Sequence, residues 1–381
     1  MSYKGIRWSE KMADSLMERT PILSQTNIHR GKWSYDYGVI LKGIEGVWKQ
    51  TGDVKYFNYI KNNMDIFIDE EGTIKGYDLD EFNLDFINNG KVLLMLYKET
   101  GQIRYKNAVD LLRRQLEDHP RTSEGVFWHK KVYPHQIWLD GLYMGAPFYA
   151  EYIKMFGNEL EFEDVTRQYL LCAKHTKDQK TGLLYHAFDE KRVQPWCHPV
   201  TGQSKSFWGR SMGWFVMGLV DTLSIIPNNH KDYKSLLMIL KETLQGLKEV
   251  QDQSSGVWYQ VLNQGKRKGN YLESSSSCMI LYAIAKGIRL HYLELEWMDV
   301  AQKAYHGIIE EFILFTEAGL INLNKTCQVA GLGGTHKRDG TFTYYISEPI
   351  IANDQKGVGA FILANIEMER LLSEGEMMGL K

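Results

Sequence analysis

Residues 35–68, YDYGVILKGIEGVWKQTGDVKYFNYIKNNMDIFI, carry the pattern that decides the fold. The first part is an apolar helical pattern rich in glycine, which breaks at Thr51-Gly52-Asp53, and a charged amphipathic helical pattern follows from Lys55 to Ile68. A short polar turn between two helical patterns predicts a helical hairpin. We expect its first helix to be buried on all sides and its second to expose one charged face.

The same order of patterns recurs along the chain, which indicates an internal repeat. The second unit begins at Asp85, turns at Thr100-Gly101-Gln102 and ends at Leu116. Four further units begin near Asp140, Arg210, Ser275 and Asp354. The last unit lacks room for a second helix unless the amphipathic helical pattern of residues 7–20 supplies it by closing a ring.

Short aromatic segments close several of these units. Residues 125–129, 182–186 and 256–260 read GVFWH, GLLYH and GVWYQ, which predicts three short strands. Two of them end in a histidine at the same position, His129 and His186. This placement indicates a cavity shared by both rings, although either could be a packing histidine.

Six helical hairpins with short connections predict an all-α fold, an (α/α)6 barrel with short β segments in the loops, as a single domain over residues 1–381. An open helical-repeat solenoid is the alternative. Because an aromatic segment precedes each inner helix, we expect the loops to converge where the inner helices begin. Helix N-termini gathered at that end favour an anionic ligand.

Composition excludes several classes of protein. The net charge of -2 and the lack of a Lys/Arg block argue against a nucleic-acid partner, and no apolar stretch is long enough to cross a membrane. The cysteines form no CxxC pair, and the N-terminal region has no apolar signal segment, so we expect a cytoplasmic protein. Motifs of serine hydrolases, zincins and EF-hands are missing from the sequence.

Carboxylates recur at the predicted starts of inner helices, at Asp36, Asp85, Asp140 and Asp354. Asp140 lies among aromatic residues, and burial there predicts a raised pKa and a general acid. An N-cap aspartate would instead have a lowered pKa, and this segment alone leaves both interpretations open. Asp85, also in aromatic company, is the predicted partner carboxylate.

Residues 205–214, KSFWGRSMGW, place Arg210 between Trp208 and Trp214. Arginine binds carboxylates through two parallel N–H bonds, so this pattern predicts a uronic-acid pocket. A buried arginine stacked on tryptophan for structural reasons is the alternative. Residues 331–335, GLGGT, lack the lysine and strand context of a P-loop, and we expect a lip on the cavity.

Three segments taken together, WLDGLYMGAPF at 138–148, FWGRSMGWF at 207–215 and VAGLGGT at 329–335, resemble the unsaturated rhamnogalacturonyl hydrolases, glycoside hydrolase family 105. The resemblance covers nearly the whole chain and implies an (α/α)6 barrel. It also implies a small oligosaccharide substrate, a rhamnogalacturonan fragment ending in a C4=C5 unsaturated galacturonic acid. The implied reaction hydrates the vinyl ether, after which the hemiketal collapses and releases the neighbouring sugar.

Carried over by position, the resemblance implies that Asp140 protonates C4 and helps to deliver water to C5, with Asp85 as its partner. It implies no metal and no cofactor, and the oligomeric state stays open. The predicted substrate-binding residues are Tyr37, His129, Lys130, Trp138, His186, Trp208, Arg210, Trp214 and Gly333.

Three other functions remain open on the sequence. An unsaturated glucuronyl hydrolase for glycosaminoglycan fragments would call for further basic residues at the mouth. A sugar 2-epimerase would use His129 and His186 to move a proton. A carbohydrate-binding protein without activity would not need Asp85 or Asp140.

Overall fold

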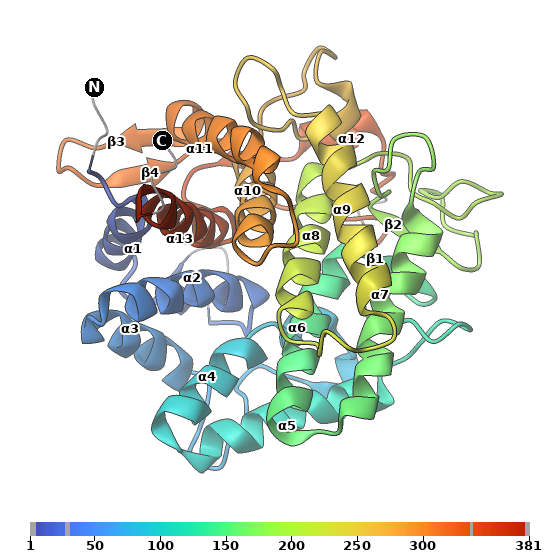
Figure 1. The fold of residues 1–381 in the computed structure, drawn as a ribbon. Helices are drawn as coiled ribbons and strands as arrows, with labels where there is room; N and C mark the ends of the chain where they lie inside the picture. Colours follow the sequence, from blue (N-terminus) through green and yellow to red (C-terminus); the bar gives the residue numbers. More distant parts are fainter. Residues whose placement is uncertain (1–4, 27–30, 336–337, 378–381) are drawn as a thin grey trace.

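A closed ring of inner helices forms the centre of the computed structural model, which describes residues 5–26, 31–335 and 338–377 (Figure 1). Each inner helix packs on the next, and the last packs on both its predecessor and the first. The predicted (α/α)6 barrel is therefore confirmed, and an open solenoid is excluded. The inner helices are α2 (Tyr35–Thr51), α4 (Gly90–Thr100), α6 (Leu139–Phe156), α8 (Gly209–Leu223), α10 (Ser274–Arg289) and α13 (Gln355–Met377).

An outer layer of helices surrounds this ring. As expected, the N-terminal helix α1 completes the layer by packing on α13 and α2, and Ser9 Oγ donates a hydrogen bond to Glu369 Oε2 at 2.7 Å. In the described ranges, no helix combines the length and apolar character needed to span a bilayer. The outer helices are α1 (Trp8–Arg19), α3 (Val54–Asp65), α5 (Ile103–Asp118), α7 (Phe162–Thr176), α9 (Tyr233–Glu249) and α11 (Met298–Phe312).

Glycine explains how closely the inner helices pack. A Cβ added to Gly359 of α13 would lie 2.8 Å from the backbone of Val39 in α2, and one added to Gly43 would lie 3.2 Å from the Gly359 carbonyl oxygen. Side chains at either position would push the two helices apart. The glycine-rich pattern of the first hairpin therefore follows from backbone-to-backbone contact inside the barrel.

Short irregular elements connect the helices, and three small antiparallel sheets lie among them. The sheets pair β1 (Gln136–Trp138) with β2 (Ala187–Asp189), β3 (Ile313–Phe315) with β4 (Ile321–Leu323), and β5 (Thr326–Cys327) with β6 (Ile350–Ile351). The remaining elements are α12 (Phe342–Ser347), η1 (Leu23–Gln25), η2 (Leu79–Glu81), η3 (Leu84–Ile87), η4 (Glu159–Glu161), η5 (Leu262–Gln264) and η6 (Leu295–Trp297).

The predicted strands at 125–129, 182–186 and 256–260 are wrong as regular strands. Each makes only an isolated β-bridge within the described chain. Phe127 and Leu184 bridge residues that follow closely on the preceding outer helix, Arg121 and Lys177, while Tyr259 bridges Leu272. Each segment pairs with residues that are close to it in the sequence, so within the described chain no second strand pairs with it over several residues.

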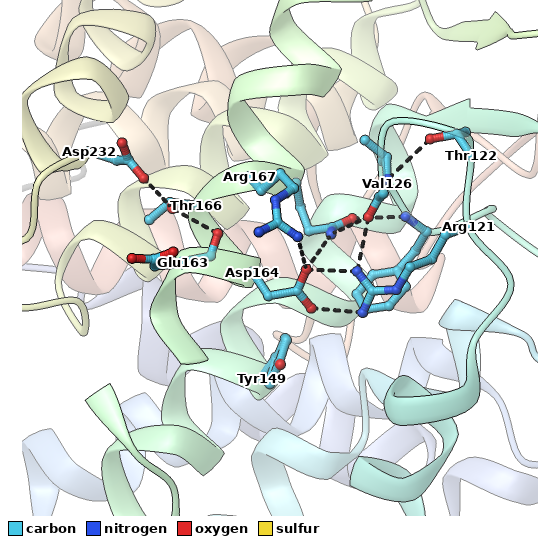
Figure 2. Close-up of polar contacts among 12 residues, drawn as sticks. Arg121, Thr122, Val126, Tyr149, Glu163, Asp164, Thr166, Arg167 and Asp232 are labelled. Atoms are coloured by element: carbon cyan, nitrogen blue, oxygen red, sulfur yellow. Dashed lines mark hydrogen bonds and ion pairs between the residues drawn. The ribbon is translucent and has the colours of Figure 1, made fainter. Parts of the chain in front are cut away.

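A network of polar side chains fixes the loop that leads from α5 to β1 (Figure 2). Asp164 of α7 accepts hydrogen bonds from Nη1 and Nη2 of Arg121, each at 2.7 Å, and Arg121 Nη1 also donates to the Gly125 carbonyl oxygen. Within the loop, the backbone N–H of Val126 donates to Thr122 Oγ1. The outer layer thus sets the path of the chain just before His129.

Candidate active site

Charged side chains converge at the end of the barrel where the inner helices begin, as the repeat predicts. Burial raises the pKa of the Tyr35 hydroxyl well above its ordinary value, and the nearby negative charges of Asp36, Asp85 and Asp354 raise it further. Asp36, Asp140 and Arg210 lie in the first turns of α2, α6 and α8, Asp85 lies in η3 before α4, and Asp354 directly precedes α13.

Two of these carboxylates share one buried lysine. Lys356 Nζ lies 3.1 Å from Asp36 Oδ1 and 2.9 Å from Asp354 Oδ2, and all three side chains are almost fully buried. Lys356 thus joins the first turn of α2 to the start of α13 through one carboxylate from each. Asp85 and Asp140, each with a side chain 13% exposed, remain as the carboxylates that solvent reaches.

Asp140 forms a chain of polar contacts with His186 and Tyr345. His186 Nε2 lies 3.0 Å from Asp140 Oδ2, and His186 Nδ1 lies 2.7 Å from the Tyr345 hydroxyl. Because an ionised carboxylate only accepts, the consistent arrangement has Nε2–H facing Asp140 and the tyrosine hydroxyl donating to Nδ1. The imidazole is fully buried, so Tyr345 holds its orientation toward Asp140.

The raised pKa predicted for Asp140 is wrong for the unliganded protein. Burial raises the pKa of this carboxyl, but the charge and polar contact of His186, followed by the charge of His129, outweigh burial, so that the net shift is downward. The N-cap alternative also fails, since Trp138 occupies the N-cap of α6 and Asp140 lies inside the first turn. The sequence shows that several rings lie near Asp140, but it does not show that His186 contacts the carboxyl group and lowers its pKa.

Asp85 is held by Lys130 and lies near His129. Lys130 Nζ is 2.5 Å from Asp85 Oδ2, and His129 Nε2 is 3.7 Å from Asp85 Oδ1. Burial lowers the pKa of His129 to about 4, so its ring is neutral near pH 7. Lys130 occupies the position that a cation would take beside Asp85, and no group of three metal-ligating side chains occurs among the described residues.

Aromatic rings connect the surroundings of Asp85 with those of Asp140. Trp138 stacks on His129 with ring centroids 4.7 Å apart and meets the edge of His186 at 5.3 Å. Tyr133 also stacks on Trp138, at 4.8 Å. Trp208 lies 4.8 Å from the His186 ring. The two histidines predicted from the repeat therefore contact the same indole, His129 beside Asp85 and His186 beside Asp140.

Arg210 is a buried structural cation in this structure. Its guanidinium, in a side chain 1% exposed, donates from Nη1 to the Cys327 carbonyl oxygen and from Nη2 to the Gln328 carbonyl oxygen at 3.3 Å. It also lies 4.9 Å from the Trp208 ring. These contacts fit the structural alternative, while the clamp on a uronate carboxylate stays a prediction. The carbonyls come from a distant strand, so no local pattern could reveal them.

Tyr37, a predicted substrate-binding residue, lies in the first turn of α2, where burial and the charge of Asp36 raise the pKa of its hydroxyl. It is buried and stacks on Phe67 at 5.4 Å, whereas Tyr35 faces the charged group and meets Trp214 edge-on at 6.4 Å. Trp214 itself is buried and packs on Tyr143 at 4.6 Å, beneath the site. The sequence did not identify Tyr35 as a site residue. Tyr35 and Tyr37 both lie in the first turn of α2, and the helical pattern alone does not show which side chain faces the charged group.

The loop at 331–335 packs over the aromatic rings. The backbone N–H of Gly333 donates to the Arg338 carbonyl oxygen at 2.8 Å, and Arg338 Nη2 donates to the Tyr133 hydroxyl at 2.9 Å. Gly333 has φ +60°, and an added Cβ would lie 3.3 Å from Trp196 Nε1. Leu332 belongs to the same apolar cluster as Trp138. The loop therefore forms a lip beside Trp138, and it brings in Arg338, a half-buried cation that the sequence motifs did not single out.

Comparison with known proteins identifies the family of this chain. The family model described as Glycosyl Hydrolase Family 88 matches residues 8–372. A solved glycoside hydrolase from family 105 of C. acetobutylicum ATCC 824 is 55% identical, covers 96% of this chain and 100% of its own, and superposes with a TM-score of 0.93. "Protein Atu3128" of Agrobacterium fabrum is 37% identical over 59% of this chain and 97% of its own length.

A further relative has a named activity. The unsaturated rhamnogalacturonyl hydrolase YesR of Bacillus subtilis (strain 168) is 28% identical over 74% of this chain and 78% of its own length. The chain therefore belongs to Glycosyl Hydrolase Family 88 as that model defines it, and it is a glycoside hydrolase of the unsaturated glycuronyl kind, which confirms the resemblance to family 105.

Proposed function

We propose that this enzyme removes a terminal C4=C5 unsaturated galacturonic acid from rhamnogalacturonan oligosaccharides. The observation that carries the proposal is the Asp140–His186–Tyr345 chain of contacts, whose His186 ring contacts the same Trp138 ring as His129, the histidine beside Asp85. The activity named for YesR supports rhamnogalacturonan as the source of the substrate.

Asp140 supplies the proton in the proposed reaction. It protonates C4 of the vinyl ether, which leaves positive charge shared between C5 and the ring oxygen. Water then adds to C5, and the ionised Asp140 takes one of its protons, so the carboxyl group is restored. The resulting C5 hemiketal opens to a ketone, and the hemiacetal left at C1 releases the neighbouring sugar with its hydroxyl group. One good acid suffices, whereas attack at the anomeric carbon would call for two carboxylates at a set separation.

In the free protein the pKa of Asp140 is lowered. The proposed reaction therefore requires that the bound substrate raise this pKa. A bound uronate carboxylate is a like charge, and a like charge within about 4–6 Å raises the pKa of an acid. Lys130 meanwhile compensates the charge of Asp85. Substrate binding therefore selects the protonated form of Asp140.

Arg338 is our candidate for holding the uronate carboxylate. Its guanidinium is half-buried at the lip and bonded to Tyr133, which stacks on Trp138 beside the histidines. Its Nε and Nη2 donate to the Gly333 and Leu332 carbonyl oxygens and to Tyr133. No acceptor within the described residues binds its Nη1, which is the donor that we assign to the ligand.

Three unsaturated disaccharides test the proposal, prepared from rhamnogalacturonan, polygalacturonate and chondroitin. Loss of the ultraviolet absorbance of the C4=C5 bond reports turnover, and we expect it to be fastest for the rhamnogalacturonan product. Faster turnover of the chondroitin product would instead assign a glucuronyl hydrolase. In heavy water, one deuterium should enter at C4. Exchange at C2 without loss of the double bond would show an epimerase, and binding without either change would show a carbohydrate-binding protein.

We also propose a cytoplasmic location, as expected from the sequence. All four cysteines are unpaired and buried, which suits a reducing compartment.

A further inference from the structure

A second cavity opens at the opposite end of the barrel. It has a volume of about 600 Å³ and lies between the later parts of the inner helices, at positions such as Lys49 of α2, Glu151 of α6, Asp221 of α8 and Lys286 of α10. Cavities that bind small molecules measure about 300–1,000 Å³. Its size therefore suits a ligand, and neither the proposed reaction nor its substrate uses this end of the barrel.

Basic groups outnumber acidic groups around this far cavity. Six lysines and two arginines line it, against three glutamates and one aspartate. Most of these carboxylates are already shared: Glu45 lies within ion-pair distance of both Lys42 and Lys49, and Glu367 binds Arg289 at 2.5 Å and Arg370 at 3.2 Å. The wall thus carries more positive charge than its own acids compensate.

Asp221 and Glu151 do not remove this excess. Asp221 Oδ1 already accepts hydrogen bonds from Lys286 Nζ and the Tyr282 hydroxyl, each at 2.6 Å. Burial raises the pKa of Glu151, which favours its neutral form. In the described chain neither group forms an ion pair with Lys91.

Lys91 is a buried cation of this wall for which the described residues supply no anionic partner. Its side chain, only 3% exposed, comes from the first turn of α4 and lines the cavity. No hydrogen bond or ion pair joins its Nζ to the part of the chain that the structure describes, and the ammonium instead lies 3.7 Å from the centroid of the Tyr143 ring. Burial lowers the pKa of Lys91 to about 7, although Asp221 and Glu151 partly oppose the shift.

Aromatic rings separate the far cavity from the candidate active site. Tyr143 lies under Lys91 and packs on Trp214 at 4.6 Å, and Trp214 in turn meets Tyr35 at the catalytic end. Tyr143 and Trp214 are both almost fully buried. An anion beside Lys91 would therefore occupy a site of its own and would not be substrate on its way to Asp140.

We propose that the far cavity binds a small oxyanion with two or more negative charges, a phosphate group or a polycarboxylate, held by Lys91 Nζ and the surplus lysines of the wall. Such a ligand supplies the counter-charge that the protein lacks there, and charge-assisted hydrogen bonds to it replace the missing partner of Lys91. The two sources share this chemistry and differ in geometry, so separate titrations distinguish them.

Calorimetric titration of the full-length enzyme with inorganic phosphate, and separately with citrate, tests the proposal at constant ionic strength adjusted with sodium chloride. We expect saturable binding, weakened about tenfold or more in Lys91→Met, because a charge-assisted hydrogen bond is lost. Methionine matches the length and shape of the buried stem, and thermal melting checks that the variant is folded. Preference for phosphate or for citrate identifies which of the two groups the cavity takes.

Two control variants separate this site from the rest of the protein. Lys234→Met removes the same charge from an exposed position on α9 and should leave the affinity unchanged. Asp140→Asn should also retain anion binding, since the ligand does not enter the candidate active site. Absence of saturable binding for both anions, or equal affinity in the wild type and Lys91→Met, would overturn the proposal, whatever the outcome for the disaccharides.

Discussion

Asp140→Asn should abolish turnover without unfolding the protein. Asparagine keeps the shape of the side chain and places a polar amide beside His186 Nε2, which lies 3.0 Å from Asp140 Oδ2. It cannot donate a proton to C4. Loss of a general acid costs about 10²–10⁴ in rate, whereas exchange of one polar contact for another changes the free energy of unfolding by about 1 kcal/mol or less.

Asp164→Asn is the matched control with the opposite outcome. An amide oxygen cannot accept both 2.7 Å bonds from Arg121 with the strength of a carboxylate. One charge-assisted bond is worth about 1.5–3 kcal/mol, and partial exposure of both side chains reduces the loss to about 1–2 kcal/mol. With about 2.1 cal/mol/K of unfolding entropy per residue, 381 residues give about 0.8 kcal/mol/K, so Tm should fall by about 1–3 °C.

Initial rates from the loss of C4=C5 absorbance, together with Tm from calorimetry, are measured for both variants. The reasoning requires a crossed result: Asp140→Asn inactive with an unchanged Tm, and Asp164→Asn active with a lowered Tm. If Asp140→Asn kept more than about a tenth of the wild-type rate, well above the loss expected for a general acid, Asp140 would not be the proton donor. If both variants lost rate and Tm in parallel, the loss of activity would reflect unfolding.

Four further predictions follow from the same contacts. Tyr345→Phe leaves Nδ1 of the buried His186 without its partner, so the free energy of unfolding should fall by about 1–3 kcal/mol and turnover should fall too; unchanged denaturant midpoints and rates would contradict this. The pKa of His129 is about 4 in the folded protein against about 6.5 in the unfolded chain, so the unfolded state takes up the proton first. Its contribution of about 3 kcal/mol is present above pH 6.5 and is lost as pH falls toward 4, and His129→Asn should flatten this part of the Tm–pH curve. Because the pKa of Asp140 is lowered in the free enzyme, kcat/KM should fall about tenfold per pH unit through the neutral range, while kcat, which reports the complex, should hold to higher pH; coincident profiles would argue against a substrate-induced shift. Arg338→Gln should raise KM about tenfold or more and change kcat less, and an unchanged KM would exclude Arg338 as the carboxylate ligand.

The repeat made the architecture predictable from the sequence. Helical periodicity and a glycine-led turn are local properties, and they recur in the units that begin at Tyr35 and Asp85. The shortage of sequence after Asp354 also predicted that residues 7–20 would close the outer layer, as α1 does. The prediction of strands at 125–129, 182–186 and 256–260 was wrong because strand pairing is not a local property of the sequence. A strand needs a partner of several residues, and the pattern within one segment says nothing about its partner.

The candidate site was predictable in its position but not in its electrostatics. Rings near Asp140 in the sequence suggested desolvation, and that effect is present, yet a nitrogen from His186 reverses its sign. Tyr345, which orients that nitrogen, comes from a short helix near the C-terminus. No pattern links these three residues along the chain, because only the folding of the loops over the end of the barrel brings them together.

Three buried cations in this barrel differ in whether groups of the protein itself compensate their charge. Arg210, Lys356 and Lys91 all lie near the start of an inner helix, and each is at most 3% exposed. Backbone carbonyl oxygens accept from Arg210, and two carboxylates flank Lys356, so both are compensated within the protein. Lys91 has no ion pair with the described residues, and its ammonium lies over the Tyr143 ring beside the far cavity. Burying an uncompensated charge costs several kcal/mol. Of these three cations, Lys91 is therefore the one whose surroundings most favour a bound anion, although no sequence motif contains it.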